Sequence, residues 1–129
     1  KALELMANNE VHVVISDMKM PQMSGAELLE QVATKYPETF RVVLTGYADI
    51  ESTIQAVNQG KIHRYLQKPW ENQELISVVE EGLERVKLKA ENLRLQKLTK
   101  LQNKKLKAIT FNNHFLRINF SLFIKFRFL

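Results

Sequence analysis

Three short apolar runs constrain the fold of this 129-residue chain more than any other feature. They occupy residues 11–16 (VHVVIS), 40–46 (FRVVLTG) and 63–70 (HRYLQKPW). Each is rich in β-branched or aromatic residues and lies next to turn-forming residues. Runs of this length and composition predict short strands buried on both faces, as in the middle of a parallel sheet.

The segments between these runs carry helix signals. "SGAE" at residues 24–27 forms a capping box, in which Ser24 and Glu27 satisfy each other's free backbone N–H groups. A helix should follow and stop before Pro37. We expect four of its side chains to be buried: Leu28, Leu29, Val32 and Ala33.

A second helix should follow Asp49, which can act as its N-cap, and Gly60 should end it. Its apolar residues Ile50, Ile54 and Val57 share one face. Residues 2–6 look like the end of a further helix. Alternating strands and helices imply right-handed parallel crossovers, so we predict an α/β fold whose parallel sheet has helices on both faces.

A different polar side chain stands at the end of each predicted strand. These side chains are Asp17, Thr45 and Lys68. Parallel strands deliver their carboxyl ends to one edge of a sheet, where ligands bind in open α/β folds. A carboxylate can attack phosphorus, while an ammonium and a hydroxyl can hold the added oxygens. The three residues therefore predict a site for phosphoryl transfer.

The motifs around these residues resemble the receiver domains of two-component response regulators. They are "SDMKMPQMSG", "VVLTGYAD" and "YLQKPW", which together cover about residues 1–85 in the right order. Thr45 follows Asp17 by 28 positions and Lys68 follows Thr45 by 23, a spacing like that of the family. The resemblance implies a flavodoxin-like sheet and a cis peptide bond before Pro69.

The resemblance also implies a role for each site residue. Asp17 would be the phosphoacceptor, Thr45 the switch hydroxyl, Lys68 its cationic partner and Tyr65 the aromatic switch. The backbone carbonyl of Lys19 would be a ligand of Mg²⁺, together with Asp17. The phosphoryl donor would be a histidine kinase or a phosphotransfer protein, and the domain itself would be regulatory rather than an enzyme.

One part of the family pattern is missing from the sequence. Receivers begin with a strand that ends in two acidic residues, and this sequence appears to enter in the second helix, without the first strand, first helix and second strand. Asp17, one carbonyl and water form a poor ligand set for Mg²⁺. We therefore expect weak or absent Mg²⁺-dependent phosphorylation. We also expect the first strand present here to lie at an exposed sheet edge, a ready template for pairing.

Charge is distributed unevenly along the chain. Residues 1–91 hold ten Lys and Arg against fourteen Asp and Glu, whereas residues 92–129 hold nine basic residues and no acidic one. The overall basic balance therefore belongs to the second part, and we expect no direct nucleic-acid binding by the first. The absence of cysteine and of a long apolar run suggests a cytoplasmic protein without a membrane span.

A helix predicted after Trp70 continues far beyond the end of a receiver. A seam with coiled-coil spacing runs through it and slips by one step near its middle; its residues are Val79, Leu83, Val86, Ala90, Leu93, Leu98, Leu101 and Ala108. We divide the chain into a partial receiver domain (1–85) and a helical extension (86–108). The extension would form a homodimer, or it would be a solvated linker.

The remaining residues, 109–129, form a Phe-rich basic tail. Apolar residues recur at every second position from Leu116 to Phe128, a pattern typical of a half-buried strand. Three interpretations stay open: a strand that covers the exposed sheet edge, a segment that lies on a membrane surface, or a stretch with no evolved role. We favour the last, and expect the tail to promote aggregation in each case.

Two other functions can use the same residues. A phosphatase or mutase of the dehalogenase type also has a nucleophilic Asp with Thr and Lys, but it carries a second Asp two positions later, where this chain has Lys19. A receiver that has lost phosphorylation would serve only as a dimerisation module. The signal receiver remains the leading hypothesis.

Overall fold

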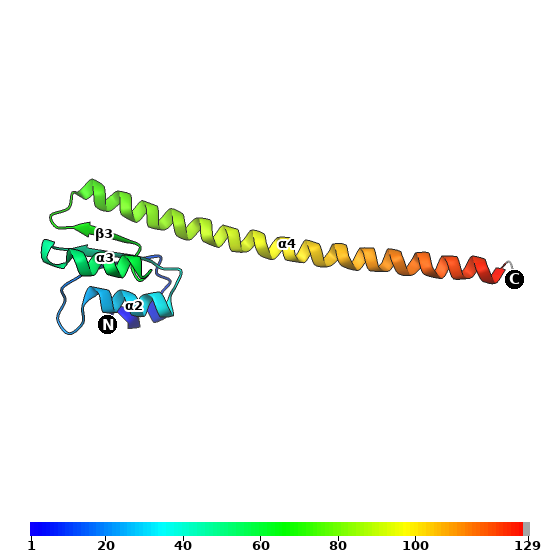
Figure 1. The fold of residues 1–129 in the computed structure, drawn as a ribbon, viewed down its shortest axis with the longest axis horizontal. Coiled ribbons are helices and arrows are strands. Elements are labelled where there is room, and N and C mark those ends of the chain that lie inside the picture. Colours follow the sequence, from blue (N-terminus) through cyan, green and yellow to red (C-terminus); the bar gives the residue numbers. More distant parts are fainter. Residues whose placement is uncertain (128–129) are drawn as a thin grey trace. The chain divides into compact units, whose positions relative to one another are not determined.

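The computed structural model describes the backbone of residues 1–127 and the side chains of residues 1–119. Strands and helices alternate along the first part of the chain, as predicted (Figure 1). The elements are α1 (Ala2–Asn8), β1 (Val13–Asp17), α2 (Gly25–Lys35), β2 (Phe40–Thr45), the 3₁₀ turn η1 (Tyr47–Asp49), α3 (Ile50–Asn58), β3 (Arg64–Gln67) and α4 (Asn72–Arg127).

The three strands form one parallel sheet in the order β1-β2-β3. Asp17 is in register with Leu44, and Thr45 is in register with Gln67. Asp17 and Thr45 thus end neighbouring strands, and Lys68 directly follows the third. Among the described residues β1 has one strand neighbour, β2, so it lies at the sheet edge as expected.

Helices cover both faces of the sheet. On one face, α2 and α3 share a core cluster in which Leu29 and Ala56 pack with Val43 of β2. On the other face, Gly82 in the first part of α4 lies directly against the ring of Phe40. The fold is therefore α/β with a parallel sheet between helices, which confirms the predicted class.

The predicted burial of the two short helices is only partly right. Leu29 and Val32 are fully buried, whereas Leu28 and Ala33 are partly buried. On α3 the buried residues are Thr53 and Ala56, and Ile54 is 43% exposed. The inward face of α3 thus includes a hydroxyl that the apolar pattern did not indicate.

Two of the three local signals that start and end these helices are confirmed, the capping box before α2 and Gly60 after α3. Ser24 and Glu27 form both hydrogen bonds of the capping box. Gly60 has a φ of 74°, the left-handed conformation that glycine adopts readily after a helix. Asp49 is the N-cap residue of α3, but its side chain makes no capping hydrogen bond.

A buried arginine holds the amino-terminal end of the sheet, opposite the strand ends that carry the polar residues. Arg41 on β2 is 4% exposed. Its guanidinium donates to the carbonyl oxygens of Lys61 at 2.8 Å, Thr39 at 2.9 Å, Pro37 at 3.2 Å and Gly60 at 3.3 Å. These bonds tie the loop before β2 to the loop before β3.

The chain divides into two compact units, Lys1–Lys89 and Ala90–Leu129. In the first unit the seam residues Val79 and Val86 are partly buried, while Leu83 is 45% exposed. In the second unit, the seam leucines are exposed: Leu93, Leu98 and Leu101.

The prediction of a strand in the tail is wrong over the described residues, because α4 continues to Arg127. Once a helix exists, adding a residue costs far less than starting a new element. No glycine or proline follows Gly82, so nothing in the sequence ends the helix early. The other two interpretations of the tail are untested.

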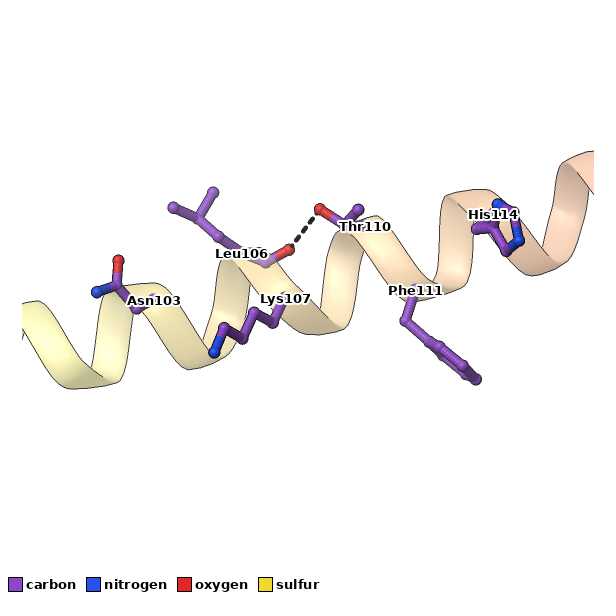
Figure 2. A pocket seen from close by; sticks show the side chains of 6 residues that line it. All are labelled: Asn103, Leu106, Lys107, Thr110, Phe111 and His114. Carbon is purple, nitrogen blue, oxygen red and sulfur yellow. Dashed lines mark hydrogen bonds between the residues drawn. The ribbon is translucent and has the colours of Figure 1, made fainter.

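A shallow hollow lies along α4 in the second unit (Figure 2). The residues that line it recur every three or four positions on this one helix: Asn103, Leu106, Lys107, Thr110, Phe111 and His114. Its walls come from a single helix, and none of the predicted site residues belongs to it. No helix among the described residues is long and apolar enough to cross a membrane.

Candidate phosphoacceptor site

The structure brings the side chains of Asp17 and Lys68 together. The Lys68 ammonium donates a hydrogen bond to Asp17 Oδ2, and both side chains are about two-fifths exposed, at 37% for Asp17 and 41% for Lys68. The backbone supports this contact, since Lys68 N–H donates to the Thr45 carbonyl at 2.8 Å and Met18 N–H donates to the Leu44 carbonyl at 2.9 Å. The peptide bond between Lys68 and Pro69 is cis, as predicted.

The second carboxylate oxygen of Asp17 also has a partner. Lys19 N–H donates to Asp17 Oδ1 at 3.0 Å. The hydrogen bond from Lys68, followed by that from the Lys19 backbone, lowers the pKa of Asp17 below its ordinary value. Asp17 is therefore a carboxylate at neutral pH, the form in which it can act as a nucleophile.

The side chain of Lys19 reaches across the strand ends to α3. Its Nζ lies 3.4 Å from Asp49 Oδ2, at the N-terminus of that helix. Lys19 is 74% exposed, so this ion pair contributes little to stability. It does place a second cation beside the loop that follows Asp17.

Thr45 is fully buried, and its hydroxyl is engaged with α3 and its own loop. Thr45 Oγ1 donates to the Gly46 carbonyl at 3.2 Å and accepts from Thr53 Oγ1 at 3.1 Å. Within residues 1–119, no hydrogen bond joins Thr45 Oγ1 to Asp17 or Lys68. The three strand ends thus lie side by side, but the hydroxyl is directed to partners other than the carboxylate.

Tyr65, the predicted aromatic switch, lies on β3 in register with Val43. Its side chain is 40% exposed. Tyr65 directly follows Arg64, the partner of Val42, and lies two residues before Gln67, the partner of Thr45 at the end of β2. This position fits the predicted role but does not test it.

Sequence analysis missed Gly25, the first residue of α2. A β-carbon at this position would lie 2.9 Å from the Asp17 carbonyl carbon and 3.0 Å from Met18 Cα, and closer still to the Asp17 carbonyl oxygen. Gly25 N–H also donates to the Met18 carbonyl at 2.9 Å. The glycine in "SGAE" is therefore needed for the close approach of α2 to the backbone of Asp17.

Sequence analysis also missed Thr53. It lies eight positions after Thr45, and the spacing of α3 places it beside Ala56 on the inward face. The only sequence signal for Thr53 is a polar residue at an inward helical position, and an apolar pattern does not indicate such a residue.

The described residues do not form a ligand set that fits Mg²⁺. Within them there is no group of three or more His, Asp or Glu side chains that could hold a metal ion. Mg²⁺ prefers six oxygen ligands in near-octahedral geometry. Here Lys68 occupies one carboxylate oxygen of Asp17, and the Lys19 carbonyl would add a single further ligand.

Comparison with known proteins identifies the family. Residues 1–80 match the response regulator receiver domain. The chain belongs to this family. The receiver match includes Asp17, Thr45, Tyr65 and Lys68, and it covers all three strands.

Curated relatives of this receiver include transcriptional regulators. The chain is 36% identical over 95 residues to the hydrogenase transcriptional regulatory protein HoxA of Cupriavidus necator, a match that covers 74% of this chain and 20% of HoxA. It is 31% identical over 83 residues to the DNA-binding transcriptional regulator NtrC of Escherichia coli, covering 64% of this chain and 18% of NtrC. The chain thus spans about a fifth of the length of these relatives.

Solved structures with the same fold include receiver domains. An uncharacterized protein from Neptuniibacter caesariensis is 55% identical, with a TM-score of 0.69, and the match covers 72% of this chain and 69% of that one. The signal receiver domain of an HD domain-containing protein from Pseudomonas fluorescens is 43% identical, with a TM-score of 0.64, covering 70% of this chain and 66% of that one. The receiver fold with its parallel sheet is therefore shared at substantial identity.

Proposed function

We propose that this receiver accepts a phosphoryl group on Asp17 from a phosphohistidine of a histidine kinase or phosphotransfer protein. An Asp17 carboxylate oxygen attacks phosphorus, the phosphorus–nitrogen bond of the donor breaks, and its electron pair stays on the donor imidazole. The product is an aspartyl-phosphate. The contact between Asp17 and Lys68 carries this proposal, because it joins a nucleophile to the cation that would hold the incoming oxygens.

Phosphorylation would change the charge balance at the strand ends. The added group brings a charge of about −1.5 to −2 at pH 7. Lys68 would follow a phosphoryl oxygen, and the Thr45 hydroxyl would turn toward it, which opens space for Tyr65 to rotate. The surface formed by α3, β3 and the first part of α4 would transmit this change.

A labelling experiment tests the assignment of Asp17. A complete receiver that contains residues 1–85 of this chain is incubated with a small phosphodonor and Mg²⁺, and its intact mass is measured. We expect one phosphoryl group in the parent and none in Asp17→Asn. Asp49→Asn is the matched control, since Asp49 is another carboxylate near Lys19 but does not contact Lys68; it should be labelled normally. Equal labelling of Asp17→Asn would contradict the proposal.

The 129-residue chain should itself be labelled much more weakly than such a complete receiver. Its described residues supply a poor ligand set for Mg²⁺. Stoichiometric labelling of this chain under the same conditions would contradict this prediction, because the residues present would then bind Mg²⁺ well enough for the transfer.

We further propose that the chain forms a homodimer through the part of α4 in the second unit. Leu93, Leu98 and Leu101 are each about half exposed on one helix. They belong to the seam of coiled-coil spacing, which slips by one step between Leu93 and Leu98, and leucines of such a seam are normally covered by a partner. A dimerisation module without phosphorylation is the alternative function. Sedimentation equilibrium should show a dimer in the parent and a monomer in Leu98→Lys, whereas Gln102→Lys should stay dimeric.

The proposed setting is the cytoplasm, where histidine kinases present their phosphoryl groups. We propose no direct contact of this receiver with nucleic acid, because residues 1–91 carry more acidic than basic side chains. NtrC is described as DNA-binding, but this chain spans only 18% of it. An electrophoretic mobility shift at physiological salt tests the point.

A further inference from the structure

Thr45 and Thr53 form a buried pair of hydroxyl groups between β2 and α3. Both residues are fully buried, and their Oγ1 atoms lie 3.1 Å apart. The pair lies on the face of the sheet that α3 covers, next to the end of β2. Hydroxyls removed from water in this way need partners within the protein.

The hydrogen bonds of the pair leave the Thr45 hydroxyl fully engaged. Thr45 uses its one proton on the Gly46 carbonyl at 3.2 Å and accepts from Thr53. Thr53 shares its own proton between Thr45 Oγ1 at 3.1 Å and the Asp49 carbonyl, four residues earlier in the chain, at 2.8 Å. A hydroxyl has a single proton to donate, so this arrangement satisfies both groups without Asp17.

The two hydroxyls differ in what they lose when Thr45 turns. If Thr45 rotates toward Asp17, Thr53 still has the Asp49 carbonyl as its acceptor at 2.8 Å. Thr45, in contrast, gives up both the Gly46 carbonyl and the bond from Thr53. Thr53 is therefore a partner that Thr45 has only in the orientation seen here.

We propose that Thr53 is a positioning residue that holds the Thr45 hydroxyl against α3 in the unphosphorylated receiver. This inference rests on the proposed function, in which Thr45 moves to a phosphoryl oxygen on Asp17. A bond to an anionic phosphoryl oxygen is charge-assisted and stronger than the neutral bond from Thr53, so phosphorylation reverses the preference. Thr53 thus sets the fraction of unphosphorylated receiver molecules in which the Thr45 hydroxyl is turned toward Asp17.

Removal of the Thr53 hydroxyl should release Thr45. Thr53→Val keeps the shape of the side chain and deletes the donor. An ordinary hydrogen bond contributes little net free energy, so the fraction of Thr45 turned away from α3 should rise about two- to tenfold. The fraction is measured in the phosphate-free protein by NMR, from the three-bond couplings of Thr45 Cγ2 to its backbone nitrogen and carbonyl carbon.

Two further variants separate positioning from a general effect on packing. Thr53→Ser keeps the hydroxyl and should leave the Thr45 rotamer as in the parent. Ser52→Ala is the matched control: Ser52 donates to the same Asp49 carbonyl at 2.9 Å, but it is exposed and has no contact with Thr45. It should leave the rotamer unchanged. If Thr53→Val does not fold, Thr53→Ala replaces it in the same comparison.

Each outcome bears on one proposal. An unchanged Thr45 rotamer in folded Thr53→Val or Thr53→Ala overturns the role of Thr53, as does an altered rotamer in Thr53→Ser. The NMR measurement needs no phosphodonor. If the Thr45 rotamer shifts in Thr53→Val but the complete receiver is not labelled on Asp17, Thr53 is a positioning residue and the phosphoacceptor assignment is wrong.

Discussion

Replacement of Gly25 by alanine should disturb the receiver at the backbone of its phosphoacceptor. The new β-carbon would lie 2.9 Å from the carbonyl carbon of Asp17 and 3.0 Å from Met18 Cα, and closer to the Asp17 carbonyl oxygen. All three atoms belong to the backbone, so no side chain can rotate to make room. Either the start of α2 or the peptide after Asp17 has to move.

The size of the effect follows from two opposing terms. Overpacking of this kind costs about 1–3 kcal/mol, and the rigid backbone on both sides places Gly25→Ala at the upper end. Alanine recovers up to about 1 kcal/mol through its better helix propensity, and less than that at the first residue of a helix. We therefore expect the free energy of unfolding to fall by about 2 kcal/mol.

Urea-induced unfolding followed by circular dichroism measures this change. Gly46→Ala is the matched control, because Gly46 also lies beside the site, has an ordinary φ of −90°, and a β-carbon there would meet nothing within 4 Å. It should change the stability by no more than about 0.5 kcal/mol. If Gly25→Ala were as stable as Gly46→Ala, the close approach of α2 to Asp17 would not constrain this position.

Three further predictions concern charged groups. Burial, followed by the nearby charge of Arg41, lowers the pKa of His63 to about 4 from its ordinary 6.5. Only the unfolded chain binds this proton between pH 6.5 and 4, so stability should fall by at most about 3 kcal/mol as the pH drops through that window; the slope of urea stability against pH should be smaller in His63→Gln. In Lys68→Met the pKa of Asp17, measured by NMR, should rise toward its ordinary value, since the hydrogen bond from Lys68 is the main cause of its lowering. An unchanged pKa would show that Lys68 does not contact Asp17 in solution. Arg41→Lys should cost at least about 2 kcal/mol in urea, because lysine cannot reach four carbonyls at once, whereas Arg64→Lys, in an exposed ion pair, should cost less than about 1 kcal/mol.

The order of elements and the ends of the strands could be predicted because short-range patterns determine them. Apolar runs, a capping box and Gly60 each act within a few residues, and these predictions agree with the structure. Parallel connections then bring the strand ends to one edge, so the proximity of Asp17 and Lys68 could be predicted from the sequence.

The errors arose where a local pattern competes with a longer-range effect. The alternation from Leu116 onward fits a strand, but a helix already in progress is extended at little cost. Ile54 has the spacing of a core residue, yet it is 43% exposed while the hydroxyl of Thr53 is buried. Gly25 and Thr53 were missed because their roles depend on contacts with residues seven or more positions away in the sequence.

Arg41 makes the amino-terminal end of the sheet less free to move than the carboxyl end, where Asp17 lies. Its positive charge cannot be titrated away under physiological conditions, and its guanidinium is hydrogen-bonded to backbone carbonyl oxygens. We therefore expect a pH change near neutrality to leave these hydrogen bonds in place. If phosphorylation of Asp17 rearranges the sheet, the amino-terminal end held by Arg41 should stay in place. The displacements should then increase toward the carboxyl ends of the strands.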